Sequence, residues 1–169
     1  MSLIPDYCFK GITDIPMDFF SQRKIKMAIL DIDNTLTEDG APDISYDVEK
    51  WIKRVQAEGI ILTIVSNNHR QRVEAFAEKI FLPYVCEAKK PSQKCLADIL
   101  AKYMVTPFET AVIGDQLFTD IWFAKRAGMV SVLVEPIGPD YLIGVMLKRF
   151  IEKPILSIWK RKGKFVYYE

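Results

Sequence analysis

The sequence predicts an α/β fold, in which helices cover both faces of a doubly wound parallel sheet. Between residues 25 and 134, short β-branched or apolar runs alternate with segments whose apolar residues recur at helical spacing. Strands that alternate with amphipathic helices are typical of such a sheet. The 169 residues, 50% apolar and 27% charged, suit one domain over residues 1–169. Within it, residues 141–169 are expected to form a C-terminal helix and a tail rich in basic and aromatic residues.

Five runs are expected as strands, at residues 27–32, 60–65, 84–86, 110–113 and 129–134. A helix is expected at residues 46–58, because apolar residues recur there at i, i+3, i+4 and i+7. These residues are Val48, Trp51, Ile52 and Val55. Gly59 follows at the position of a C-terminal cap.

The same spacing predicts three more helices. The apolar stripe of the first is Val73, Phe76, Ala77 and Ile80. The stripe of the second is Leu96, Ile99, Leu100 and Tyr103. We expect Ser92 to cap the N-terminus of that second helix. The third is expected at residues 117–127, closed by Gly128.

Polar and charged residues follow four of the expected strands. In chain order they are Asp31, Asp33 and Thr35, then Ser66 and Asn67, then Lys90, and finally Asp115 and Asp120. The carboxyl ends of parallel strands share one edge of a sheet, and ligands bind outside that edge. We therefore expect a functional site there.

The residue types at this edge suit phosphate chemistry. Asp31, Asp33 and Asp115 would repel one another unless a cation lay among them, and oxygen ligands without His or Cys favour Mg²⁺. Lys90 supplies positive charge, and Ser66 supplies a hydrogen-bond donor for a phosphate. The Asp31 carboxylate is placed to attack phosphorus, with Asp33 first protonating the leaving oxygen and then activating water.

These segments, in this order, resemble the motifs of the haloacid dehalogenase superfamily of phosphohydrolases. Its DxDxT motif appears at residues 31–35, and its second motif matches Ser66. Its third motif matches Lys90 followed by Pro91, and its GDxxxxD motif appears at residues 114–120. The resemblance implies a hydrolase that uses Mg²⁺ and forms an aspartyl-phosphate.

The resemblance also implies a role for each matching residue. The metal ligands would be the carboxylates of Asp31 and Asp115 and the backbone carbonyl of Asp33. Catalysis would depend on Asp31, Asp33 and Lys90. The phosphate would be bound by Ser66, Asn67 and Lys90, with Thr35 and Asp120 in support.

The spacing between motifs leaves no room for a cap domain. Between Asp33 and Ser66 lie 32 residues, and between Ser66 and Lys90 lie 23, and each gap already holds a helix and a strand. The chain thus resembles the capless type III class, and within it the branch of bacterial YqeG-like proteins and the mitochondrial phosphatidylglycerophosphatase. That branch implies phosphatidylglycerophosphate as a substrate. The alternatives are a phosphatase of soluble sugar or nucleotide phosphates and a non-catalytic phosphate-binding partner protein.

Several positions allow two interpretations. Asp120 is either a site residue or a helix cap, and Lys89 competes with Lys90 for the phosphate. Asn67 either contacts the site or caps the next helix. His69 is interpreted as a partly exposed first-turn residue, because the aspartates already supply acid and base. The cysteines, Cys8, Cys86 and Cys95, lack CxxC spacing and are interpreted as reduced thiols.

The C-terminal segment concentrates positive charge in a chain whose net charge is only +1. Residues 141–169 hold seven basic and two acidic residues, and the apolar residues of the expected helix at 141–151 cover about 240° of its wheel. A membrane-surface anchor for anionic lipid and a homodimer surface explain this equally well. The short run 160–164 does not indicate nucleic-acid binding. We expect a cytoplasmic protein without a signal peptide or membrane span, with peripheral contact to the inner membrane surface as one interpretation.

Overall fold

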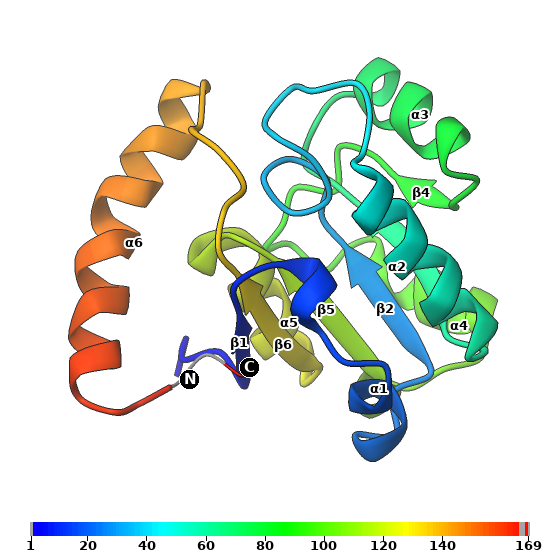
Figure 1. The fold of residues 1–169 in the computed structure, drawn as a ribbon, viewed down its shortest axis with the longest axis horizontal. Coiled ribbons are helices and arrows are strands. Elements are labelled where there is room, and N and C mark those ends of the chain that lie inside the picture. The colour runs from blue at the N-terminus through cyan, green and yellow to red at the C-terminus, as the bar shows by residue number, and fades with distance from the viewer. Residues whose placement is uncertain (1, 166–167, 169) are drawn as a thin grey trace.

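A computed structural model describes residues 2–165 and 168, and it contains one sheet of six parallel strands in the order β1-β6-β5-β2-β3-β4 (Figure 1). The strands are β1 (Tyr7–Phe9), β2 (Met27–Leu30), β3 (Ile61–Val65), β4 (Tyr84–Val85), β5 (Thr110–Gly114) and β6 (Val130–Val134). β2 is central and pairs with β3 and β5, so that Leu30 lies between Ile64 and Ile113. The predicted α/β fold with a parallel sheet is confirmed.

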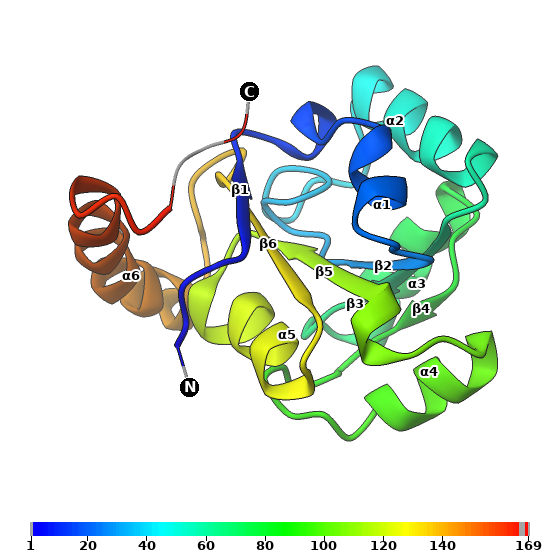
Figure 2. The ribbon, with the colours of Figure 1, turned by 90° about the horizontal axis from the view of Figure 1, so that it is seen from below.

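Helices cover both faces of this sheet, as Figure 2 shows. They are α1 (Asp18–Gln22), α2 (Tyr46–Ala57), α3 (Arg70–Lys79), α4 (Leu96–Tyr103), α5 (Trp122–Ala127) and α6 (Ile143–Arg161). Buried residues of α1, α2 and α3 share one core cluster with the β2 and β3 side chains Leu30 and Ile64. Residues of α4 and α5 share a second cluster with Ile29 and Val112. The connections on either side of β3 hold only α2 and α3 with loops, so no cap domain is inserted, as predicted.

Three details of β1, α4 and the segment before α5 differ from the sequence-based expectation. β1 was not predicted, because three residues are too few for a periodic pattern, and it forms by pairing with β6 at the sheet edge. α4 begins at Leu96 with Cys95 at its N-cap position, so Ser92 does not cap it. The segment expected as one helix begins with a π-helical turn, Leu117–Ile121, before α5. Gly128 closes α5 with a φ of +71°, as predicted.

α6 is longer than the expected helix and continues through Pro154 to Arg161. Its second half packs beside the β1 edge, where Ile155, Leu156 and Trp159 contact a cluster that includes Cys8 and Leu133 (Figure 1). This packing holds the helix together past the proline, which cannot donate a backbone hydrogen bond. Among the described residues, none of the helices has both the length and the apolar character needed to cross a bilayer.

The cysteine in β1 provides a test of this packing. Cys8 is fully buried, and burial raises the pKa of its thiol to about 12. All three cysteines are free, and Cys86 and Cys95 are partly exposed. Because the thiolate is the reactive form, a thiol reagent at about pH 8 is expected to label Cys86, to label Cys95 more slowly because partial burial raises the pKa of its thiol, and not to label Cys8 in the native protein. Peptide mass spectrometry checks this result, with urea-unfolded protein as the fully labelled control. Rapid native labelling of Cys8 would contradict the placement of β1.

Candidate active site

Five of the predicted site residues meet in one pocket at the carboxyl edge of the sheet. They are Asp31, Asp33, Ser66, Asn67 and Lys90. The pocket has a volume of about 190 Å³, below the roughly 300–1,000 Å³ of pockets that enclose a whole ligand. It therefore has room for a phosphoryl group and only a small part of an ester's leaving group.

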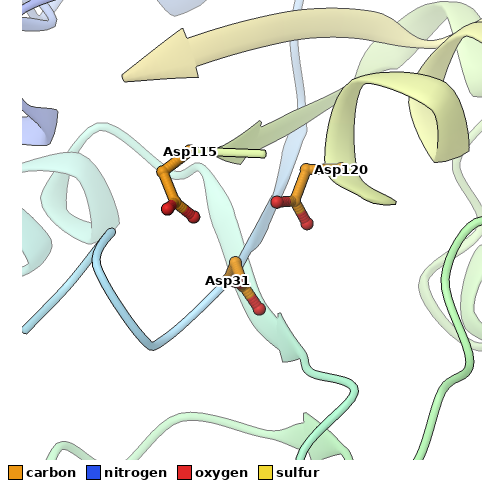
Figure 3. Close-up of side chains that lie close together, drawn as sticks. All are labelled: Asp31, Asp115 and Asp120. Atoms are coloured by element: carbon orange, nitrogen blue, oxygen red, sulfur yellow. The ribbon is translucent and has the colours of Figure 1, made fainter. Parts of the chain in front are cut away.

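Three carboxyl groups lie together beside this pocket, at the ends of β2 and β5 (Figure 3). Asp31, Asp115 and Asp120 are buried, and one oxygen from each lies within 4.8 Å of the others. Gly114 makes this approach possible, because a Cβ there would lie 2.4 Å from Cγ of Asp120. The motif GDxxxxD therefore needs glycine at position 114, because any side chain there would clash with Asp120. Of the two interpretations of Asp120, the structure favours the site role, although its carboxylate also accepts from the backbone N–H of Gln116.

Lys90, and not Lys89, reaches these carboxylates. Its Nζ lies 2.8 Å from Oδ1 of Asp31 and 2.5 Å from Oδ1 of Asp120, whereas Lys89 is exposed. Burial raises the pKa of Asp31 to about 7, because desolvation outweighs the opposing attraction of Lys90. The neighbouring Asp120 and Asp31 carboxylates raise the pKa of Lys90 against its own desolvation. Lys90 therefore stays charged next to Asp31.

Asn67 holds the Lys90 loop in place. Its side-chain oxygen accepts from the backbone N–H of Lys90 at 2.6 Å, and its amide donates to the Lys90 carbonyl at 3.1 Å. His69, not Asn67, occupies the N-cap position of α3, so Asn67 is not the cap. Ser66 is buried, and its hydroxyl oxygen accepts from the Asn68 backbone N–H at 3.1 Å. His69 is exposed at the pocket rim.

Asp33 lines the pocket but is not part of the carboxylate cluster. Its carboxylate accepts from the Arg72 guanidinium at 2.9 Å, from the Asn68 amide at 3.1 Å and from the Gly40 backbone N–H at 3.1 Å. These three donors come from α3 and from the loops that flank the pocket. Asp31 and Asp33 therefore share the pocket, but their side chains have different partners.

One buried charged residue that the sequence did not identify as part of the site is Arg149 of α6. Its guanidinium is buried and pairs with the Asp115 carboxylate, and it also donates to the Asp115 carbonyl at 2.5 Å. It contacts Glu152 at 3.2 Å and Asp140 at 3.0 Å. Thr35 donates to the other Asp115 oxygen at 3.2 Å. Asp115 is therefore held from two sides, by the first motif and by α6.

A hydrogen-bond chain connects the first motif to the start of α6. Asn34, with a φ of +61° that asparagine adopts more readily than most residues, donates from its amide to Asp140 at 2.9 Å. Its side-chain oxygen accepts from the Gly138 backbone N–H at 3.0 Å. One sequence signal pointed to this arrangement: Arg149 interrupts the apolar arc of the expected helix, and Glu152, at i+3, carries the opposite charge.

Carboxylates outnumber cations in this cluster. Among the described residues, the buried charged side chains are Asp31, Asp115, Asp120, Glu152, Lys90 and Arg149. Four carboxylates thus face two cations, and an unbalanced buried charge is costly. A divalent cation would balance the two remaining charges. The clustered donors are hard carboxylate oxygens, which is the ligand chemistry that Mg²⁺ prefers.

Comparison with known proteins agrees with this geometry. The model of the family described as mitochondrial PGP phosphatase matches residues 1–137. The chain is 34% identical over 166 residues to the "Probable phosphatase YqeG" of Bacillus subtilis, covering 98% of this chain and 96% of that protein. It is 25% identical over 171 residues to an Arabidopsis thaliana phosphatidylglycerophosphate phosphatase 1 and covers 95% of this chain but 49% of that protein.

Solved structures share the fold. A cobalt-bound deoxy-D-mannose-octulosonate 8-phosphate phosphatase from Haemophilus influenzae superposes with a TM-score of 0.54 at 17% identity, over 66% of this chain and 69% of its own. An uncharacterised Listeria monocytogenes protein gives a TM-score of 0.55 at 15% identity, over 64% and 78% of the two chains. At these identities the likeness supports the fold alone.

Proposed function

Because the chain belongs to the mitochondrial PGP phosphatase family and is a capless phosphatase of the haloacid dehalogenase type, we propose that it hydrolyses phosphomonoesters through an aspartyl-phosphate on Asp31. The observation that carries this proposal is the buried Asp31–Lys90 pair in a pocket sized for a phosphoryl group. A nucleophilic carboxylate needs a neighbouring positive charge to accept a phosphate dianion, and Lys90 supplies it.

The excess of buried carboxylate supports Mg²⁺ as the cofactor. We propose that the Asp31 and Asp115 carboxylates and the Asp33 backbone carbonyl hold it, with Asp120 in support. When bound, Mg²⁺ would offset the charge repulsion between the substrate phosphate and Asp31. Arg149 and Thr35 orient the Asp115 carboxylate for this role.

The proposed reaction has two steps. Oδ1 of Asp31 accepts from Lys90, so Oδ2 attacks phosphorus, and the bond from phosphorus to the ester oxygen breaks. The leaving oxygen takes a proton from the Asp33 carboxyl group, which therefore has to enter this step protonated and released from its contact with Arg72. Asp33 then removes a proton from water, whose oxygen attacks the phosphorus and releases inorganic phosphate and the Asp31 carboxylate. Lys90 stabilises the negative charge in both steps.

Phosphatidylglycerophosphate is the substrate we favour. The matching family and the name of the Arabidopsis relative support it, and so does a pocket that admits only the phosphoryl end of an ester. The second candidate class is soluble phosphomonoesters. It is favoured by a Pyrococcus furiosus glyceraldehyde 3-phosphate phosphatase, 28% identical over 92 residues, which are 49% of this chain and 38% of that protein.

A substrate panel tests the proposed function. Purified protein would be assayed for phosphate release from phosphatidylglycerophosphate in mixed micelles, glycerol 3-phosphate, sugar phosphates and nucleoside monophosphates. We expect Mg²⁺-dependent release, with the highest kcat/KM for the lipid. Higher kcat/KM for a soluble ester would favour the second class. No release from any ester would contradict the proposed hydrolase.

Metal binding is expected to depend on Asp115. Replacing Asp115 by asparagine removes one anionic ligand, so Mg²⁺ affinity should fall about 10-fold or more. Isothermal titration calorimetry on chelator-treated protein measures this directly, without turnover. Glu58→Gln, an exposed carboxylate at the end of α2, is the matched control and should leave the affinity unchanged. Full activity after exhaustive chelation would contradict the metal requirement.

Replacing Asp33 by asparagine tests whether Asp33 donates a proton to the leaving group or only helps to bind the substrate. The variant cannot protonate the leaving oxygen, so kcat/KM for an alkyl phosphate should fall by about 10²–10⁴-fold. The loss should be much smaller for p-nitrophenyl phosphate, whose leaving group needs no proton. The second step does not affect this comparison, because kcat/KM reports the steps up to loss of the leaving group. Asp39→Asn, another carboxylate lining the pocket, is the control. Equal losses on both esters would argue against proton transfer by Asp33.

A further inference from the structure

The first half of α6 has its polar and apolar faces reversed relative to an ordinary surface helix. Its inward side carries the buried charged pair Arg149 and Glu152. Large apolar side chains point outward instead: Phe150 is 80% exposed, Ile143 75% and Leu147 65%. A helix on the surface of a soluble domain normally buries such residues and exposes charges. Packing within this chain therefore does not explain the outward residues.

These residues form one continuous surface, which we call the α6 outer face. It consists of Ile143, Met146, Leu147, Phe150, Ile151 and Ile158. Spacings of three and four residues, and of seven between Ile151 and Ile158, place them on the same side of the helix. Figure 1 shows that α6 stands at the side of the molecule, and among residues 2–165 and 168 no other element covers this face. Exposed apolar surface of this extent marks an interaction site.

The exposed charges along α6 and directly after it have a single sign. The exposed basic residues along and after α6 are Lys153, Lys160, Arg161, Lys162 and Lys164. Between Ile143 and Lys164, all of them described, the one acidic residue is Glu152, which is buried against Arg149. A partner for this surface must therefore accept apolar side chains and carry negative charge.

We propose that the α6 outer face docks on the surface of a lipid bilayer that contains anionic lipid. Apolar side chains would enter the boundary between headgroups and acyl chains, while the basic residues contact the headgroups. A second copy of this chain fits less well, because it would bring the same positive charges to the contact. The helix would lie in the plane of the interface, since it does not meet the requirements of a membrane span.

This orientation has a consequence for the active site. Leu142, Val145 and Lys148, at the start of α6, line the same pocket as Asp31. A bilayer on the α6 outer face would therefore be separated from these pocket residues by about the width of one helix, roughly 10 Å. This consequence rests on the proposed function, whereas docking itself does not.

Vesicle co-sedimentation tests the docking. Full-length protein would be spun with phosphatidylcholine vesicles, with or without phosphatidylglycerol, at low and high salt. We expect binding only to the anionic vesicles, and several-fold less at high salt, because screening shortens the electrostatic range from about 30 Å at 0.01 M to about 3 Å at 1 M ionic strength. Phe150→Gln combined with Leu147→Gln should reduce the bound fraction at least several-fold. Phe108→Gln, equally 80% exposed but outside α6, is the matched control and should bind like the wild type.

Two further measurements, of hydrolysis and of oligomeric state, distinguish vesicle docking from catalysis and from dimerisation. Hydrolysis of p-nitrophenyl phosphate should be the same in all these variants, because neither Phe150 nor Leu147 lines the pocket. Loss of vesicle binding with normal hydrolysis thus tests docking alone, while wild-type binding without hydrolysis would contradict only the phosphatase. Absent binding, or equal binding to neutral vesicles, would overturn the proposal. Analytical ultracentrifugation tests the other occupant. A dimer that Phe150→Gln dissociates, in a protein that does not bind vesicles, would assign the α6 outer face to a second copy.

Discussion

Replacing Asp31 by asparagine is expected to abolish turnover, leaving less than about 1% of the wild-type kcat. The amide is nearly the same shape as the carboxylate but is a poor nucleophile toward phosphorus. Lys90 keeps its second partner, Asp120, so the fold should survive. Steady-state phosphate release on p-nitrophenyl phosphate measures the loss, with mass spectrometry to exclude deamidation back to aspartate. A larger residual rate would mean that Asp31 is not the nucleophile.

In metal-free protein, Asp31→Asn is also expected to change how the melting temperature depends on pH. The pKa of Asp31 is raised from 3.8 to about 7 by burial, so the folded state holds this proton more tightly than the unfolded chain does. Asp31 therefore destabilises the fold increasingly as pH rises from about 4 to about 7. Asp31→Asn should flatten this part of the curve of Tm against pH, measured with chelator. Asp98→Asn, at an exposed carboxylate, should leave the curve unchanged.

The strand ends could be predicted because the pattern that identifies them is local. Residues 60–65 and 110–113 are continuous β-branched or apolar runs, and in a parallel sheet their carboxyl ends must share one edge. Once that edge was known, Asp31, Ser66 and Asp115 were expected to lie near one another. The structure places Asp31 and Asp115 in one cluster and Ser66 on the wall of the adjoining pocket.

The partners of these residues could not be predicted in the same way. Whether Arg149 is a surface charge or a buried one depends on where α6 docks, which no short-range pattern encodes. The π-helical turn at Leu117–Ile121 likewise forms where Asp120 must face Asp31 past Gly114. Such turns are frequent at functional sites, but their sequence looks like that of an ordinary helix.

Arg149→Met is expected to lower the free energy of unfolding by about 3–5 kcal/mol, the cost typical of removing one partner from a buried ion pair. The guanidinium contacts Asp115, Glu152 and Asp140, and a methionine would leave these carboxylates without it. Arg149→Lys should recover only part of the loss, because an ammonium cannot reproduce the planar fork of donors. Urea unfolding in chelator measures each value without contribution from bound metal.

A double-mutant cycle distinguishes ion pairing from simple loss of packing. Combining Arg149→Met with Glu152→Met removes both charges, so no carboxylate is orphaned at position 152, and the apolar side chains fill similar volume. The double variant should therefore be more stable than Arg149→Met alone, with an interaction energy of at least about 1 kcal/mol. Additive losses would indicate that Arg149 is not energetically coupled to Glu152 and stabilises the fold through its other partners, Asp115 and Asp140. Asp115 still lacks its guanidinium in the double variant, so Mg²⁺ affinity should stay altered while stability recovers only in part. This difference separates the role of Arg149 in orienting Asp115 from its pairing with Glu152.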